Sequence, residues 1–422
     1  MHSLDNASDD ISVKVRHQKY KNVLGESLSL GMEPIYLDHA ATTPLDPEVL
    51  EAMIPYFTDA SANANSAHQL GRRAKVAVED SRETIASILG AEPSEIVFTS
   101  GGTESDNAAI RGVFEVAHRK GRSEIVTSEI EHHAVIHPAE CLKLSGAKPI
   151  YVPVSPSGGV TADALSSVCG DKTAIVSLMH VNNEVGTINP IADLADVAHQ
   201  NGAYFHTDAV QSVGKLPVNV NELNVDFLSL SGHKLNGPKG IGVLFVKNGS
   251  PWIPLIHGGS QEKRRRGGTL NVPAIVGLAS AMAKADAQRQ TRWAHYQQCR
   301  TLFLNSLKEH ADGYFEINGG LDSEVERVPH ILNLCFHSPE GKTLDGEMLL
   351  LNLDIENVCV SNGSACTSGA VEPSHVLLGM GISTQQAMSS IRLSIGHSNT
   401  PEELTHAAKT ISNVVKRMLS KP

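Results

Sequence analysis

The chain has 422 residues, of which 41% are hydrophobic and 19% are charged, and its formal net charge at pH 7 is -11. This composition is typical of a folded globular protein and excludes a disordered chain, while the negative charge argues against a nucleic-acid-binding or acidic-membrane-binding surface. Because the length exceeds the usual limit for one hydrophobic core, two domains are expected.

The N-terminal residues and the cysteines indicate in which cellular compartment the protein is expected. Residues 1–33 contain acidic and basic side chains without the apolar stretch of a signal peptide, so they are expected to form a poorly ordered extension. The cysteines are scattered without a CxxC pair, as is typical of free thiols in a reducing compartment, and we expect a cytoplasmic protein. Since no apolar run approaches the roughly 20 residues that span a bilayer, no membrane partner is expected.

From about residue 45 to 290, short apolar runs alternate with helical patterns. The expected strands cover 95–100, 124–129, 148–154, 173–181, 203–210, 225–231 and 240–246, and the expected helices include 74–89, 105–120 and 191–201. This alternation predicts an α/β fold with a mostly parallel sheet and helices on both of its faces. Polar clusters follow the strands (TSGGT, EHH, HVNNE, HTDAVQ and SGHK), at the carboxyl ends where ligands bind in such sheets.

The remainder of the chain has a different pattern. A long polar helix is expected over 283–310, then the apolar run PHILNLCF, and a closing helix over 401–419. These elements indicate a smaller α+β domain. We therefore predict a large domain over 45–292, and a small C-terminal domain formed by 34–44 and 293–422.

Lys234 occupies an unusual position, in the glycine-rich turn between two apolar strands. At such a position a lysine usually lies on the surface or pairs with a carboxylate. If buried, its pKa would fall and its amine would become nucleophilic, as a Schiff base with a carbonyl cofactor requires. Pyridoxal phosphate (PLP) is such a cofactor, and it also needs an acid near its ring nitrogen and donors around its phosphate.

Candidates for these further tasks follow other strands. Asp208 could hold a proton on a pyridine nitrogen, or could be a helix N-cap. The turn SGGTES, with Thr103, opens a helix whose N–H groups can bind phosphate, although this signal alone is weak. His132 could stack on the ring or lie on the surface. Asn183 and Gln211 could donate to ring or substrate oxygens, or satisfy buried backbone groups.

A set of motifs in one order decides between these interpretations. They are YLDHAATTP, TSGGTESDN, EHHAV, MHVNNEVGTI, HTDAVQSVGKLP, SGHKLNGPKGIG, RRRGGTLNVPAIVG, SNGSACTSGAVEPSHVL and SSIRLSIG. Over about residues 34–415 the sequence resembles the PLP-dependent cysteine desulfurases of the NifS/IscS type, within the class V aminotransferase-like enzymes. The resemblance implies the aspartate aminotransferase-like fold (fold type I), with a seven-stranded sheet in the large domain.

The resemblance also implies roles for residues around the cofactor ring. Lys234 would bind PLP covalently, and Asp208 would pair with the ring nitrogen. His132 would stack on the ring and assist proton transfer. Gln211 would bond the phenolic oxygen, with Asn183 close to both ring and substrate.

Further roles concern the phosphate and the substrate. The resemblance implies that the phosphate is held by Gly102, Thr103, Ser231 and His233. Thr269 is expected to reach the phosphate of a neighbouring subunit, which implies a homodimer. Arg392 would clamp the substrate carboxylate, a bidentate task that suits its planar guanidinium.

Cys366 distinguishes the activities within this group of enzymes. Its Gly/Ser-rich setting, SNGSACTSGA, predicts an exposed loop, where a cysteine can also simply be tolerated. The resemblance implies a catalytic thiol that carries persulfide sulfur, or transiently an iron–sulfur species, with no resident metal. The expected reaction converts L-cysteine to L-alanine, and a sulfur-acceptor protein would use the sulfur for iron–sulfur clusters or thio-cofactors.

The sequence also offers two alternatives to a cysteine desulfurase. A selenocysteine lyase or an aminotransferase-like relative would share the PLP site without needing Cys366. A non-catalytic docking protein would be expected to have lost part of the set formed by Lys234, Asp208, His132 and Arg392. The sequence departs from the family at Ala64, which replaces a proline and concerns loop stiffness more than chemistry. It also lacks the longer C-terminal tail of scaffold-binding members, which puts the mode of sulfur hand-off to that scaffold in doubt. The acceptor is therefore left open.

Overall fold

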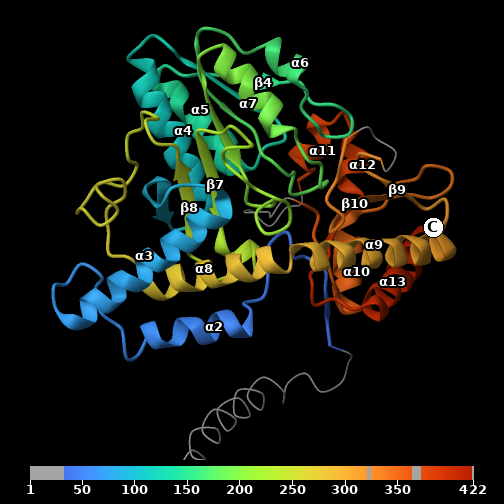
Figure 1. The fold of residues 1–422 in the computed structure, drawn as a ribbon. Coiled ribbons are helices and arrows are strands. Elements are labelled where there is room, and N and C mark those ends of the chain that lie inside the picture. The colour runs from blue at the N-terminus through green and yellow to red at the C-terminus, as the bar shows by residue number, and fades with distance from the viewer. Residues whose placement is uncertain (1–32, 321–324, 364–371, 421–422) are drawn as a thin grey trace, which may run out of the picture.

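The computed structural model describes residues 33–320, 325–363 and 372–420, so nearly all of the predicted extension 1–33 lies outside the described residues. A seven-stranded sheet forms the centre of the larger part of the molecule (Figure 1). Its strands, in spatial order, are β2 (Ile96–Thr99), β8 (Gly242–Val246), β7 (Phe227–Ser231), β6 (Tyr204–Asp208), β5 (Thr173–Ser177), β3 (Glu124–Ser128) and β4 (Lys148–Val152). β8 alone runs opposite to the other six strands, which confirms the predicted mostly parallel sheet.

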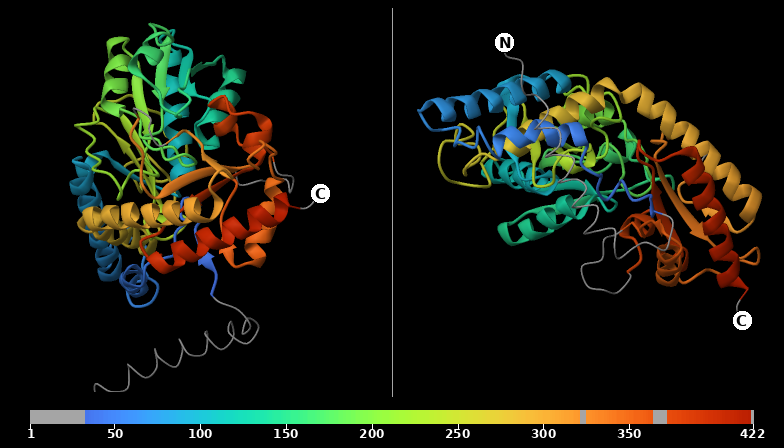
Figure 2. Two further views of the ribbon diagram at one scale, coloured as in Figure 1. Left: turned by 90° about the vertical axis from the view of Figure 1, so that its right-hand side faces the viewer. Right: turned by 90° about the horizontal axis from the view of Figure 1, so that it is seen from below.

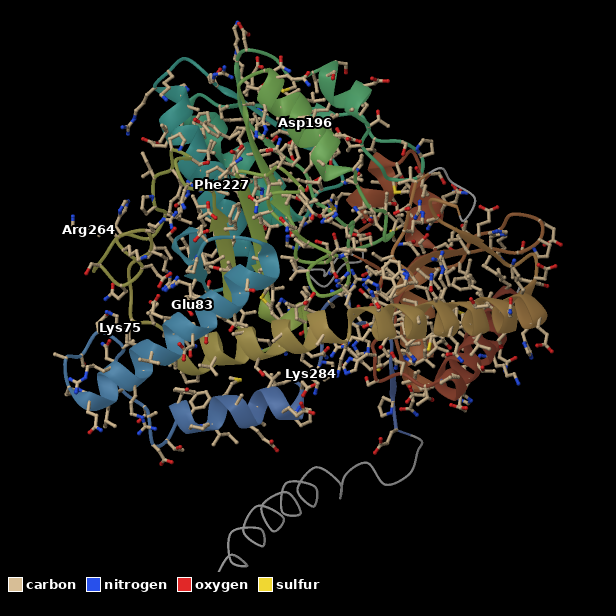
Figure 3. All side chains as sticks on the ribbon, in the orientation of Figure 1. Lys75, Glu83, Asp196, Phe227, Arg264 and Lys284 are labelled. Atoms are coloured by element: carbon tan, nitrogen blue, oxygen red, sulfur yellow. The ribbon has the colours of Figure 1, made fainter. Side chains whose placement is uncertain are left out.

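Both faces of this sheet are buried, as is usual for parallel sheets. In β8, Val243 and Phe245 face one core and Leu244 faces the other, the alternation expected of a strand. The first core is completed by α3 (Gln69–Leu89), α7 (Ile191–Gln200) and α8 (Val272–Ala287), and the second by α4 (Gly102–His118) and α5 (His133–Cys141). Phe227, labelled in Figure 3, begins β7 and belongs to the second core.

A smaller α+β part has a core of its own, visible at one end of the molecule in Figure 2. Its antiparallel sheet has the order β12 (Ser390–Ser394), β10 (Ile331–Phe336) and β9 (Phe315–Ile317), covered by α9 (Arg289–Ala311), α10 (Gly346–Ile355) and α13 (Pro401–Leu419). β1 (Ile35–Tyr36) pairs with β11 (Val358–Cys359), so the start of the segment before residue 45, with Ile35 and Leu37, packs with the small part. The domain boundaries that we predicted remain a prediction, which these separate cores support.

One expected element differs from the structure. The single helix predicted over 283–310 is two helices, α8 and α9, which meet at Gln288. The reason is that the two helices bury their apolar faces in different cores: Leu278 and Met282 of α8 face the large sheet, whereas Phe303 and Leu307 of α9 face the small one. One straight helix could not serve both cores.

Shorter elements connect these layers. They are α2 (Pro47–Met53), α6 (Ala162–Ser166), α11 (His375–Gly379), α12 (Thr384–Met388), and the 3-10 turns η1 (Ile54–Tyr56), η2 (Pro93–Glu95), η3 (Leu142–Ser145) and η4 (Gly232–Lys234). In the part of the chain that the structure describes, no helix is both long and apolar enough to cross a bilayer.

Candidate active site

A cavity of about 440 Å³ lies at the carboxyl ends of the parallel strands, bordered by the small part of the molecule. This is the edge where ligands bind in open α/β sheets. Among the residues that line it are these predicted site residues: Gly102, Thr103, His132, Asn183, Asp208, Gln211, Ser231, His233, Lys234 and Arg392. The folded chain therefore brings together residues that lie almost 300 positions apart in the sequence.

Lys234 ends the 3-10 turn η4, directly after β7. The turn depends on Gly232, because a Cβ there would lie 2.9 Å from the carbonyl oxygen of Pro238. The Lys234 Nζ donates hydrogen bonds to the carbonyl oxygens of Ala40 (2.6 Å) and Ala41 (2.7 Å). Burial and, to a smaller extent, the Arg392 charge lower the pKa of Lys234 to about 8, although Asp208 and Asp38 act in the opposite direction. A larger fraction of neutral, nucleophilic amine is therefore present near neutral pH.

Asp208 is the last residue of β6, and its side chain accepts a hydrogen bond from the backbone N–H of Val210 (2.9 Å). Burial raises its pKa to about 6, whereas the Val210 N–H and Lys234 oppose this rise. Two further buried carboxyl groups lie near it, and sequence reasoning missed both. Burial raises the pKa of Asp106 well above its usual value and that of Glu131 to about 8. Of the three, only Asp208 has the Lys234 charge opposing the rise in its pKa.

His132 is the N-cap of α5, and its Nδ1 accepts a hydrogen bond from the backbone N–H of Ala134 (3.1 Å). This bond fixes the ring and leaves Nε2 as the protonated nitrogen of the neutral imidazole. Burial lowers the pKa of His132 to about 4, and the nearby Lys234 charge contributes. The imidazole is therefore neutral at physiological pH.

An anion-binding end of the site lies at the start of α4. The first N–H groups of a helix have no intrahelical acceptor, so Gly102 and Thr103 offer free donors to an anion. Ser231, His233 and Lys239 line the same hollow, which has a volume of about 340 Å³. The acid of that hollow, Glu104, is paired with Arg266 at 2.9 Å. This donor set suits a phosphate group.

Arg392, on β12, contributes a buried guanidinium from the small part of the molecule. Its NH2 group pairs with Asp38 Oδ1 (2.7 Å), and its NH1 group donates to the carbonyl oxygen of Asn183 (3.2 Å). Sequence reasoning gave Asp38 no role, although this residue lies within the motif YLDHAATTP. The Arg392–Asp38 pair orients the guanidinium at the cavity wall.

Besides Oδ1 of Asp106, two buried polar atoms at this cavity lack a hydrogen-bond partner among the described residues. They are Oε1 of Gln211, whose Nε2 donates to the Ala40 carbonyl oxygen (2.9 Å), and Nε of Arg392. Buried polar groups are nearly always satisfied, so these atoms indicate a polar ligand. Together with the amine of Lys234, the carboxylate of Asp208 and the donors at α4, they fit an aromatic aldehyde that carries a phosphate, such as PLP.

The predicted thiol Cys366 lies in 364–371, outside the described residues, but the chain on both sides of this segment meets at Glu184. Glu184 accepts a hydrogen bond from Ser374 Oγ (2.6 Å), and a Cβ added at Gly363 would collide with its carboxylate. Gly363 and Glu184 both line the cavity. The two flanks of the cysteine segment are thus fixed beside the site, an arrangement that sequence reasoning did not find.

Thr269 is exposed and does not line the cavity of its own chain. Its predicted contact is with the phosphate of a neighbouring subunit. The contact therefore remains a prediction.

Comparisons with known proteins agree with this geometry. Residues 35–406 match the family described as Aminotransferase class-V. The chain is 42% identical to the cysteine desulfurase IscS of Dictyoglomus turgidum, over 91% of this chain and 95% of that protein. It is 41% identical to the cysteine desulfurase IscS of Methanosarcina thermophila, over 94% of this chain and 96% of that protein. The solved structure of a NifS-like protein superposes with a TM-score of 0.83 at 36% identity, over 91% of this chain and all of the other.

Proposed function

The chain belongs to the aminotransferase class-V family, and on this premise we propose that it is a PLP-dependent cysteine desulfurase, which converts L-cysteine to L-alanine and releases the sulfur as a persulfide. The observation that carries this proposal is the meeting of Lys234, Asp208, His132 and Arg392 at one cavity. Each of these residues has the burial and the hydrogen bonds that its task requires.

The proposed cofactor contacts follow the polarity of the cavity. Lys234 would hold PLP through its ε-amino group, and Asp208 would hold the proton of the ring nitrogen. Gly102, Thr103, Ser231 and His233 would bind the phosphate, with Gln211 at the phenolic oxygen. When bound, PLP supplies an electron sink that stabilises negative charge on the substrate carbon atoms.

The remaining tasks fall to side chains of the chain itself. The Arg392 guanidinium would bind the carboxylate of L-cysteine in a bidentate manner, with Asn183 beside it. His132 would stack on the cofactor ring and assist proton transfer as a hydrogen-bond donor through its Nε2–H, because its low pKa keeps the imidazole neutral. The amine of Lys234, with a pKa of about 8, is also able to exchange a proton near neutral pH.

Cys366 would accept the sulfur atom. In the net reaction the Cβ–S bond of L-cysteine breaks while a new S–S bond forms to the Cys366 thiolate. The electron pair of the broken bond stays on carbon and takes up a proton, which gives L-alanine. The persulfide on Cys366 then passes its terminal sulfur to an acceptor protein or a thiol.

The test is to incubate the purified holoenzyme with L-cysteine and a thiol reductant, and to measure alanine and sulfide. We expect both products in equal amounts from the wild type. Lys234→Ala should lose nearly all turnover, whereas Lys247→Ala, which removes an exposed lysine far from the cavity, should retain it. Wild-type protein that binds PLP without forming alanine would contradict the proposal.

A homodimer is part of the proposal. It is supported by a set of exposed apolar side chains on α2 and η1, namely Leu50, Ile54 and Phe57, whose exposed fractions are 44%, 47% and 60%. Exposed apolar groups of this size that lie together are typical of an interface. Cytoplasmic location and the identity of the acceptor protein remain predictions.

A further inference from the structure

A second, much smaller cavity lies next to Lys234. Its volume is about 20 Å³, which is enough for one water-sized particle, since about 10–15 Å³ suffices for a water molecule. The backbone of Lys234 and its neighbours forms one wall, and β12 continues into another at Gly396 and His397. The proposed desulfurase reaction makes no use of this cavity.

The lining of this small cavity is strongly basic. Lys215, Arg292 and three imidazoles (His39, His330 and His397) contribute to it, and none of the residues that line it is acidic. Arg292 is 8% exposed, and its Nε and NH2 groups donate to the neutral side chain of Gln288. Among the described residues, neither Arg292 nor Lys215 has a carboxylate within 4.0 Å, the distance of an ion pair.

The nearest acidic side chains are already engaged. Asp46, at the start of α2, pairs with Lys284 (2.9 Å) and caps its own helix, and Glu48 also pairs with Lys284. Lys284, labelled in Figure 3, lies where α8 approaches α2. Because a buried arginine cannot lose its proton, the positive charge of Arg292 persists beside the cavity at every physiological pH.

His330 supplies the observation that points to a ligand. Its side chain is 2% exposed, its ring lies against Tyr296, and neither ring nitrogen has a hydrogen-bond partner among the described residues. Since a neutral imidazole carries one N–H, a buried donor of this ring is left unused. An unmade buried hydrogen bond is destabilising, so such a donor is normally satisfied by a bound water molecule or ion.

The positive charge of the lining decides whether a water molecule or an anion fits this cavity. A water molecule would satisfy His330 but would leave the charge of Arg292, and that of Lys215 in its protonated form, uncompensated. An uncompensated buried charge is strongly destabilising. A single anion would accept a hydrogen bond from the His330 N–H and would also compensate the positive charges of the lining. We infer that this cavity binds one small monovalent anion of the halide class, held by Lys215, Arg292 and His330.

Lys215 connects the anion site to the active site. Its Nζ donates to the backbone carbonyl oxygen of Lys234 (3.2 Å), and burial together with the charges of Lys234 and Arg292 lowers its pKa to about 7. An anion beside Lys215 would raise that pKa, so halide binding should be tighter below pH 7 than above pH 8. The other groups that face Lys215 are His39, His233 and His330, and burial lowers the pKa of each so that the imidazoles are neutral.

The first test uses the wild-type holoenzyme, crystallised with sodium bromide. We expect one anomalous bromine peak between Lys215, Arg292 and His330. A water molecule in the cavity at high bromide concentration would overturn the inference, as would a carboxylate of a second subunit placed against Lys215. Because this test uses no variant and no activity measurement, its outcome is independent of the desulfurase proposal.

The second test measures thermal unfolding in sodium chloride and in sodium gluconate at equal ionic strength. Ligand binding to the folded state raises Tm, and we expect the wild type to melt about 3 °C higher in chloride. Lys215→Met should lose this difference, and Lys247→Met, which removes an exposed lysine, should keep it. If Lys215→Met does not fold, His330→Phe serves as the second variant. Equal Tm values of the wild type in the two salts would contradict the site.

Discussion

At the scale of single residues, the proposed chemistry depends on proton affinities that burial sets. Lys234, His132 and Asp208 are all shifted toward their neutral forms by desolvation. For Lys234 the neutral form is the nucleophile, so its shift favours capture of an aldehyde. For Asp208 the shift must be reversed by a cation, which a protonated ring nitrogen would supply.

The pKa of Lys234 predicts how fast the apoenzyme captures PLP at different pH values. The rate should rise about tenfold per unit below pH 8 and level off above it, because only the neutral amine attacks. Asp38 holds the pKa up, so Asp38→Asn should move the midpoint to lower pH. Stopped-flow absorbance on the apoenzyme measures both curves. A flat profile between pH 6 and 9 would exclude Lys234 as the group that limits capture.

At the scale of elements, an internal ion pair positions the loop that carries Thr269. Arg82 of α3 and Glu262 form two hydrogen bonds (2.7 and 2.9 Å), with side-chain exposures of 6% and 1%. Glu262 also accepts the backbone N–H of Phe98 in β2 (3.0 Å). One carboxylate thus joins a helix, a strand and the loop.

Removal of this carboxylate should be costly. Glu262→Ala leaves the buried Arg82 paired only with the half-exposed Glu79 (3.2 Å), and we expect a loss of about 3 kcal/mol in the free energy of unfolding. The matched control is Glu115→Ala, which breaks the exposed pair with Arg119 and should cost less than about 1 kcal/mol. Urea denaturation of both variants measures these two losses in the free energy of unfolding. Similar losses in the two would show that Glu262 does not anchor the loop.

Gly363 offers a second test at this scale, because it fixes one flank of the cysteine segment. Its φ is +95°, and a Cβ there would collide with Glu184. Gly363→Ala should bind PLP normally but lose at least about tenfold in alanine formation, a loss of about 1.4 kcal/mol in transition-state stabilisation. Gly341→Ala has a comparable φ of +86° with open space around the added atom, so it controls for backbone strain. Equal rates in the two variants would refute a role for the contact with Glu184.

At the scale of the whole molecule, much of the architecture could be predicted from the sequence. The parallel strands could be recognised as short apolar runs, and residues of the polar clusters that follow them line the cavity. Local patterns could not show where α8 ends and α9 begins, because the break at Gln288 arises from two separate cores. The buried acids Asp106 and Glu131 were missed for a similar reason: their neighbours come from distant strands.

The central claim is that Cys366 receives sulfur from L-cysteine bound at the Lys234 site. The most direct measurement is the mass of the Cys366 peptide after the holoenzyme has been incubated with L-cysteine and the free thiols alkylated. We predict one added sulfur atom on Cys366 in the wild type and in Cys141→Ser, which lacks an exposed thiol, and none in Lys234→Ala. Alanine formation without added sulfur on Cys366, or added sulfur that persists in Lys234→Ala, would contradict this account.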